Sequence, residues 1–256
     1  MWRHGLSRHP WGLWAGRISP AGFPSVRCGR IQENNPVTEI ICDRCGTCCR
    51  KGGPALHRQD MDLVRSGVIR PAHMVTLRRG EMAYDEARDE VSPLQEELVK
   101  LRGAVRGSWT CLFFMPAEIG CRIYNSRPAE CRALSCKDTS AILGMYDKDR
   151  LTRRDILADN AELLSLVEAH EASCPYAPLA ELGPRLRSDE DAARRLLEAV
   201  RLDLSFREVV AERTSVPAED MDFLFGRPLT ETVHRMYGIR VQRRGDDLFL
   251  APAQAV

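Results

Sequence analysis

The stretch CDRCGTCC at residues 42–49 holds four of the ten cysteines in this chain. Two cysteines separated by two residues can turn both thiolates toward one cation, and this spacing occurs here twice in succession. Cys42, Cys45 and Cys48 also match the first three positions of the bacterial ferredoxin pattern. The stretch therefore predicts a site for zinc or iron, and we expect the fold to form around it.

Four later cysteines can complete this site, and Cys174, which precedes a proline, is a possible remote ligand. The predicted metal ligands are Cys42, Cys45, Cys48, Cys49, Cys111, Cys121, Cys131 and Cys136. Eight thiols are enough for two four-thiolate sites or for one cluster with spare ligands, such as a 4Fe-4S cluster, and both alternatives stay open. Thiolate sulfur suits zinc and iron equally, so the sequence leaves the metal open as well.

The adjacent pair Cys48 and Cys49 is expected to point in two directions and to serve different ions, or different irons of one cluster. Basic residues flank the thiols and can offset the negative charge of a thiolate centre; they are Arg44, Arg50, Lys51, Arg122, Arg127 and Arg132. We do not include His57 and His73 among the ligands, because single histidines are more often surface or core residues.

Composition excludes several classes of protein. Lys and Arg number 37 against 36 Asp and Glu, a net charge of +1, so neither nucleic acid nor an anionic membrane is an expected partner. The sequence contains no run of about 20 apolar residues, the length that a membrane-spanning helix needs. Without a convincing export signal we expect a cytoplasmic protein with reduced thiols, which favours metal coordination over disulfides.

Three regions are expected along the 256 residues. Residues 1–36 are basic and rich in proline and arginine, and we expect them to be a disordered tail. Residues 37–180 form the cysteine-cluster domain, and residues 181–256 form a helical C-terminal region. The expected fold class is α+β, mostly α, with a small irregular core held by metal and few short strands.

Local patterns predict the elements. Residues 109–124 read as two short strands around a loop, and Arg127-Pro128 begins a helix that must end early if Cys131 and Cys136 are to bind one ion. The remaining predictions are helices at 60–64, 94–101, 152–170, 189–200, from 205 onward, 217–225 and 228–237, and a hairpin at 239–250 around Gly245.

Residues 42–49, 111–114, 120–124 and 127–132, with Asp60, resemble the motifs of the YkgJ-type cysteine-cluster family. The resemblance covers about residues 38–137 and implies a domain that chelates zinc or iron. The FliB-type lysine N-methylases have a similar cysteine cluster and are a distant analogy. The present chain contains no glycine-rich loop for a nucleotide-like cofactor.

Three classes of function are compatible with these patterns. A structural or metal-handling module requires closed four-thiolate coordination, and its folding depends on the metal. An electron-transfer protein requires a reducible cluster near the surface. An iron–sulfur enzyme requires an iron with an open position and a substrate pocket. We rank them in this order, and the sequence identifies neither a catalytic residue nor a substrate.

Overall fold

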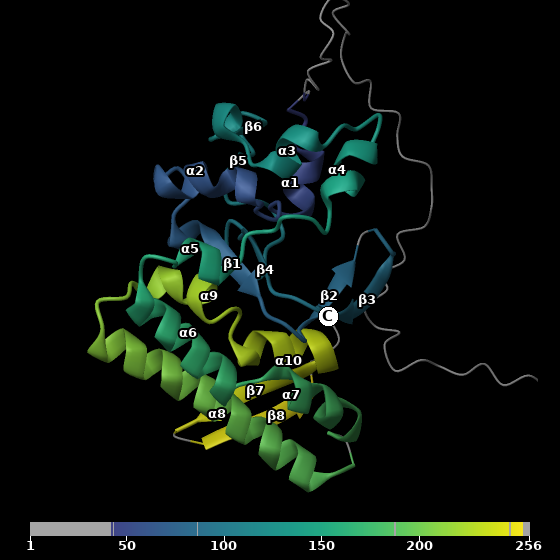
Figure 1. Cartoon of the computed structure of the whole chain (residues 1–256). Helices are drawn as coiled ribbons and strands as arrows, with labels where there is room; N and C mark the ends of the chain where they lie inside the picture. The colour runs from purple at the N-terminus through teal and green to yellow at the C-terminus, as the bar shows by residue number, and fades with distance from the viewer. Residues whose placement is uncertain (1–41, 43, 86, 187, 246, 253–256) are drawn as a thin grey trace, which may run out of the picture.

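The computed structural model describes residues 42, 44–85, 87–186, 188–245 and 247–252 (Figure 1). The expected tail at 1–36 lies outside these residues. Within the described residues, helices, most of them short, combine with four two-stranded antiparallel sheets, which confirms the mostly α, α+β class. Among the described helices, none combines the length and the apolar character needed to cross a bilayer.

The elements that carry Cys48, Cys49, Cys121 and Cys131, and the short elements around them, gather at one end of the molecule, at the top of Figure 1. They are α1 (Thr47–Lys51), η1 (Arg58–Asp60), α2 (Met61–Arg65), β5 (Phe114–Met115), β6 (Gly120–Cys121), η3 (Tyr124–Ser126), α3 (Ala129–Ala133) and α4 (Ser140–Met145). The two strands predicted in residues 109–124 and the short helix predicted at residues 60–64 are confirmed. All these helices are too short to be stable alone, so tertiary contacts must hold them.

Two hairpin-like pairs lie in the middle of the chain. Here β1 (Met74–Leu77) pairs with β4 (Leu98–Leu101), and β2 (Met82–Asp85) with β3 (Glu90–Pro93), while η2 (Pro71–His73) precedes β1. The helix predicted at 94–101 is therefore wrong. Burial alternates along β4, where Val99 and Leu101 are buried, and this period of two outweighs the cap-like residues before it.

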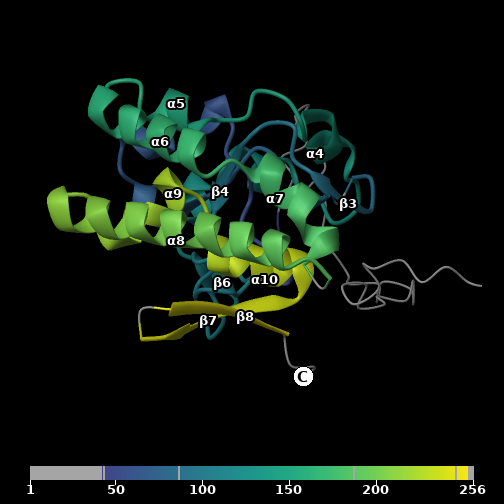
Figure 2. The ribbon, with the colours of Figure 1, turned by 90° about the horizontal axis from the view of Figure 1, so that it is seen from below.

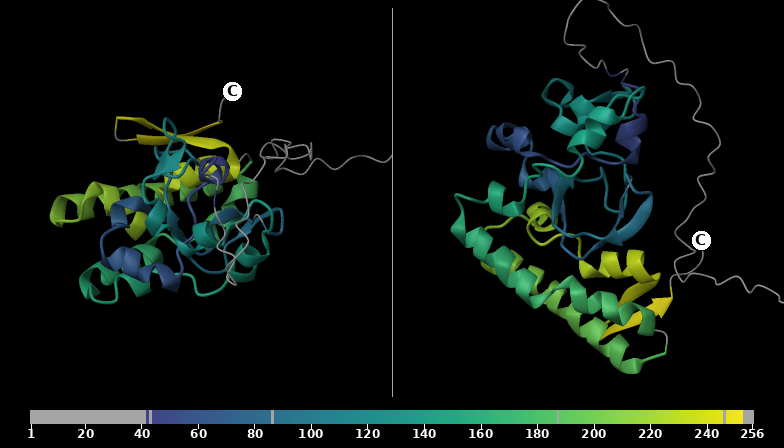
Figure 3. Two further views of the ribbon diagram at one scale, coloured as in Figure 1. Left: turned by 90° about the horizontal axis from the view of Figure 1, so that it is seen from above. Right: turned by 45° about the vertical axis from the view of Figure 1, so that its right-hand side comes forward.

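The rest of the chain forms the other end of the molecule, as Figures 1 and 3 show. Its elements are α5 (Arg153–Ile156), α6 (Ala161–Ser173), α7 (Tyr176–Leu182), η4 (Gly183–Arg185), α8 (Glu190–Arg213), η5 (Ala218–Asp220), α9 (Met221–Leu224), α10 (Leu229–Tyr237), β7 (Ile239–Arg244) and β8 (Asp247–Pro252). The terminal hairpin is confirmed, as is the predicted helix at 228–237, which ends at Gly238 with a φ of 62°.

Two predicted helices have different bounds. The pattern at 152–170 is interrupted, because α5 ends and Asn160 caps a new helix, α6, by accepting from the Leu163 N–H at 3.0 Å. In contrast, α8 runs without a break through Ser205, where a new helix was predicted. Val200 and Val210 are buried on the two sides of Ser205, so one continuous apolar face keeps the helix whole.

Two hydrophobic clusters stabilise the fold. The first joins Leu56 and Met74 to Phe223 and Phe225 of the C-terminal region, and the half-buried Cys49 and Cys121 pack against it. The second lies between α7, α8, α10 and the terminal hairpin, whose stacking Figure 2 shows from below. The first cluster thus contains residues from both sides of position 180, where the domain boundary stays a prediction.

Candidate metal centre

The first cysteine segment enters the fold through Gly46, which precedes α1. Gly46 has a φ of 77°, and a Cβ at this position would lie 2.5 Å from two ring carbons of Phe114. Glycine therefore allows both the left-handed turn and the close approach to the ring. The guanidinium of Arg50 covers the same ring at 4.8 Å and donates to the Cys45 carbonyl at 3.2 Å. These contacts fix α1, which carries Cys48 and Cys49.

The side chains of Cys48 and Cys49 act on each other: this interaction lowers the pKa of Cys48 and raises that of Cys49, because the pair loses its first proton more readily than its second. Both cysteines lie on the short helix α1, which ends at Lys51.

The second cysteine segment is fastened to the first by main-chain bonds. The Cys111 N–H donates to the Cys49 carbonyl at 2.7 Å, and Cys111 also bridges to Gly103 in β fashion. Cys121 lies opposite Phe114 in the β5–β6 pair, which brings it back beside the same segment. The main-chain bond from Cys111 and the β5–β6 pair thus bring the thiols of Cys111 and Cys121 near the vicinal pair.

The third segment is α3, which contributes Cys131. Burial raises the pKa of this thiol, and proximity to Cys111, Cys48 and Cys121 raises it further. The pKa values of Cys111 and Cys121 are also raised, first by burial and then by neighbouring cysteines, which for Cys121 include Cys42. Thiols from three separate segments of the chain therefore lie within electrostatic reach of one another.

Cys45 and Cys136 lie closer to the surface than Cys111 does. The Cys45 thiol, half-buried, donates to Thr47 Oγ1 at 3.3 Å. Cys136 is exposed and follows α3, which ends at Ala133, so the early helix end required for Cys131 and Cys136 to meet is present. No disulfide joins the cysteines that the structure describes, as a reduced metal site requires.

The donor set fits zinc or iron. Thiolates are the preferred ligands of zinc in closed sites and of iron–sulfur clusters, and the neighbouring guanidinium groups offset their charge. The clustered sulfur atoms are not arranged as a compact set of ligands. In the described part of the chain, the three ligand atoms within 4.8 Å of one another belong instead to His170, Cys174 and Asp203.

A network of three polar side chains, Asp60, His57 and Glu130, holds the third segment in place; we call it the polar bracket. Asp60 is 0% exposed; its Oδ2 accepts from the His57 N–H at 3.0 Å and its Oδ1 from the Ala129 N–H at 2.7 Å. Ala129 is the first residue of α3, which carries Cys131. Asp60 thereby ties the start of this helix to η1, and the sequence had indicated it only through the family motif.

His57 and Glu130 complete the bracket. The Nδ1 of His57 lies 2.7 Å from the Lys148 carbonyl, and its Nε2 lies 3.2 Å from Glu130 Oε1. Both partners accept, so both ring nitrogens donate, and the hydrogen bond to Glu130 raises the pKa of His57. Glu130 Oε2 also accepts from the Ala55 N–H at 2.8 Å. His57 thus has a structural role in this network, which its isolated position in the sequence could not reveal.

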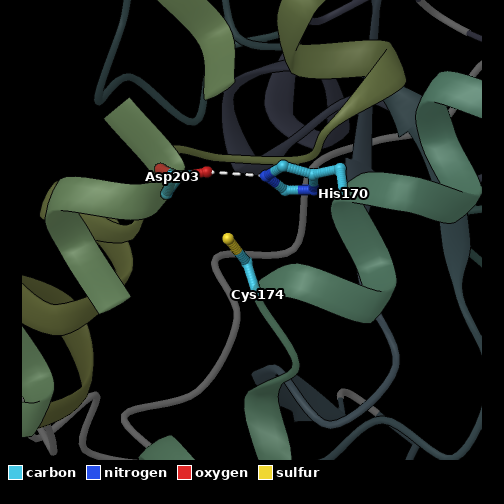
Figure 4. Close-up of side chains that lie close together, drawn as sticks. All are labelled: His170, Cys174 and Asp203. Carbon is cyan, nitrogen blue, oxygen red and sulfur yellow. Dashed lines mark hydrogen bonds and ion pairs between the residues drawn. The ribbon is translucent and has the colours of Figure 1, made fainter. Parts of the chain in front are cut away.

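Cys174 lies at the other end of the molecule, between α6 and α7, and not with the other cysteines (Figures 1 and 4). Its Sγ, a ring nitrogen of His170 and an oxygen of Asp203 lie within 4.8 Å of one another, and all three residues are buried. Figure 4 shows the His170 ring turned toward Asp203, with Cys174 beside the pair.

The oxygens of Asp203 are already used. Oδ1 accepts from His170 Nε2 at 2.8 Å and from Arg207 Nε at 3.0 Å, and Oδ2 accepts from the Leu229 N–H at 2.9 Å. A cation would have to displace these donors and approach the positive charges of Arg207 and Arg78. Burial also raises the pKa of Cys174 to about 11, so its thiol is neutral. We therefore interpret this trio as a hydrogen-bonded junction of α6, α8 and α10.

Residues 41–149 match the model of the family CxxCxxCC, described as "Putative zinc- or iron-chelating domain". The match confirms the resemblance seen in the cysteine motifs and supports metal binding by this segment, which is less than half of the chain. No curated protein and no solved structure matches the chain.

Replacing Asp60 with alanine should lower the free energy of unfolding by about 2–5 kcal/mol, because it leaves two buried backbone N–H groups without acceptors. Urea unfolding followed by circular dichroism measures the change. Asp62→Ala, on the exposed face of α2, is the matched control and should change the value by less than about 0.5 kcal/mol. Equal effects of the two substitutions would show that Asp60 does not hold the start of α3 in place.

Because His170 is buried, we expect the free energy of unfolding to depend on pH. Burial lowers its pKa, so as the pH falls below about 6.5 the unfolded chain takes up a proton that the folded chain does not. The free energy of unfolding should therefore fall with decreasing pH, by at most about 1.4 kcal/mol per pH unit for this group. His170→Gln can still donate to Asp203 but does not titrate, so its unfolding curve from pH 8 to pH 5 should be flatter. Parallel curves for the two proteins would refute this role.

Proposed function

We propose that residues 37–180 form a metal-binding module whose ligands come from the cysteines at 42, 45, 48, 49, 111, 121, 131 and 136. The observation that carries this proposal is the meeting of three cysteine segments, where the vicinal pair lies within electrostatic reach of Cys111 and Cys131. Clustered thiolates are costly to bury without a cation, and a bound ion offsets that cost.

A structural or metal-handling role for zinc is the first form of this proposal. Closed thiolate coordination would join short helices that cannot be stable alone, and metal-binding energy would then contribute to folding energy. A second form is an iron–sulfur centre such as a 4Fe-4S cluster, which would add electron transfer. Clustered cysteines without disulfides among the described residues suit a reducing compartment, and we propose the cytoplasm.

Metal analysis distinguishes the two forms. The full chain is purified without oxygen, and its zinc, iron and acid-labile sulfide are measured together with its visible spectrum before and after reduction. Colourless protein with zinc supports the structural form, and brown protein with iron and sulfide supports the redox form. A chain that retains neither metal, even after it is offered zinc or iron in excess, contradicts both.

Replacing Cys45 or Cys131 with serine should lower the bound metal and the melting temperature together, because each change removes a thiolate ligand. Metal per chain is measured after dialysis against a chelator, and melting by calorimetry. Cys174→Ser is the control, since Cys174 lies in the α6–α8 junction, and this variant should keep its metal. Full metal content and unchanged melting in both ligand variants would exclude these two cysteines as ligands.

A further inference from the structure

The segment 130–148 carries two of the proposed ligands, Cys131 and Cys136. It passes through α3 and α4 and is followed by residues 149–151, which pair with residues 56–58 through main-chain hydrogen bonds. Closing a segment of this length costs conformational entropy, because its two ends must be held together. The contacts that hold these ends therefore decide how the segment presents its two thiols.

One side chain, His57, touches both ends of this segment. Its Nε2 lies 3.2 Å from Glu130 Oε1 at the start, and its Nδ1 lies 2.7 Å from the Lys148 carbonyl at the end. An imidazole ring can donate only from its two nitrogens, and both face acceptors that lie on the segment. The residue is 1% exposed, so solvent does not compete for these bonds while the fold is intact.

The backbone of His57 is fixed independently of its ring. Asp60 Oδ2 accepts from the His57 N–H at 3.0 Å, and His57 forms an antiparallel β bridge with Arg150. The ring therefore holds the segment from a fixed point in the fold. Without the ring, Glu130 Oε1 and the Lys148 carbonyl would lose the donor group that they share, and the two ends could move apart.

The start of the segment bears directly on a proposed ligand. Glu130 immediately precedes Cys131, and both lie in the five-residue helix α3, which adds little stability of its own. The position of Cys131 thus depends on how the side chain of Glu130 is held, by His57 on one oxygen and by the Ala55 N–H on the other at 2.8 Å. Cys136 follows α3 within the same segment, so closure of the segment also limits where this exposed thiol can lie.

We propose that His57 is a positioning residue of the metal centre: by joining Glu130 to the Lys148 carbonyl, it closes the segment that carries Cys131 and Cys136 before metal binds. This inference rests on the proposed metal-binding function and adds to it a residue outside the ligand set. A segment that is already closed loses less conformational entropy on binding, so it binds metal more tightly than an open one. Groups that support metal ligands from outside commonly change metal affinity by about 10–100-fold.

Two conservative variants separate the two bonds of the ring. In His57→Gln the amide nitrogen takes the place of Nε2 and can donate to Glu130, whereas in His57→Asn it takes the place of Nδ1 and can donate to the Lys148 carbonyl. His57→Ala removes both donors. The control for a general loss of stability is Val233→Ala, because Val233 is 1% exposed in the second hydrophobic cluster, which contains none of the proposed ligands.

The experiment uses the full chain with cobalt(II) ions as the probe. Competition against a chelator gives the affinity, and the intensity of the sulfur-to-cobalt charge-transfer band reports how many thiolates are bound. His57→Ala should bind cobalt about 10-fold more weakly and show a weaker band, because Cys131 and Cys136 are no longer held in place. His57→Gln and His57→Asn should each recover part of both losses, and Val233→Ala should keep the affinity and the band of the unmodified chain.

A second measurement needs no metal. Hydrogen exchange of the metal-free chain, followed by mass spectrometry, should be faster across residues 131–147 in His57→Ala than in the unmodified chain, because the segment opens more often. Unchanged exchange in these residues would overturn the positioning role. A loss of cobalt affinity in Val233→Ala as large as in His57→Ala would also overturn it, because His57 would then act only through general stability.

Failure of the unmodified chain to bind cobalt through sulfur would instead overturn the proposed function on which the inference rests, while hydrogen exchange would still test the closure of the segment. Circular dichroism identifies any variant that fails to fold. If His57→Ala is such a variant, His57→Gln and His57→Asn carry the comparison, and each should show weaker cobalt binding and faster exchange than the unmodified chain.

Discussion

Burial and mutual repulsion hold the thiols of Cys111, Cys121 and Cys131 in their protonated form, because neutral groups cost less than anions beside an apolar core. A metal ion reverses this balance, since it binds thiolates and supplies the positive charge that the interior lacks. The short elements around the thiols follow from the same constraint. Helices of five residues such as α1 and α3 add little stability of their own, so they depend on what fixes their ends.

Polar groups as well as thiols fix the ends of these short helices. Asp60 and Glu130 fasten α3 through backbone N–H groups, and Gly46 brings α1 against an aromatic ring. At the far end, Asp203 performs the same task for α6, α8 and α10 by accepting from His170, Arg207 and the Leu229 N–H. The two ends therefore differ in chemistry. Clustered thiols mark one end, and at the other end both oxygens of Asp203 are paired.

The sequence predicted the elements whose signals are local. Gly238 ends α10, Gly245 lies at the turn of the terminal hairpin, and the cysteine spacing indicated the site and its family. The errors arose where tertiary contacts decide. Residues 94–101 have a helix-like start but are held as a strand by pairing with β1, and α8 passes Ser205 because its buried face continues. The role of His57 could not be foreseen, since its partners Lys148 and Glu130 are distant from it in sequence.

The central claim is that thiols from three segments converge on one metal centre, and X-ray absorption at the metal edge tests it most directly. The measurement uses the full chain purified without oxygen and the metal that it retains. The account predicts a first coordination shell made of sulfur, at about 2.3 Å. A shell of nitrogen and oxygen alone, at about 2.0–2.2 Å, would contradict it, because the metal would then be bound by groups other than the clustered cysteines.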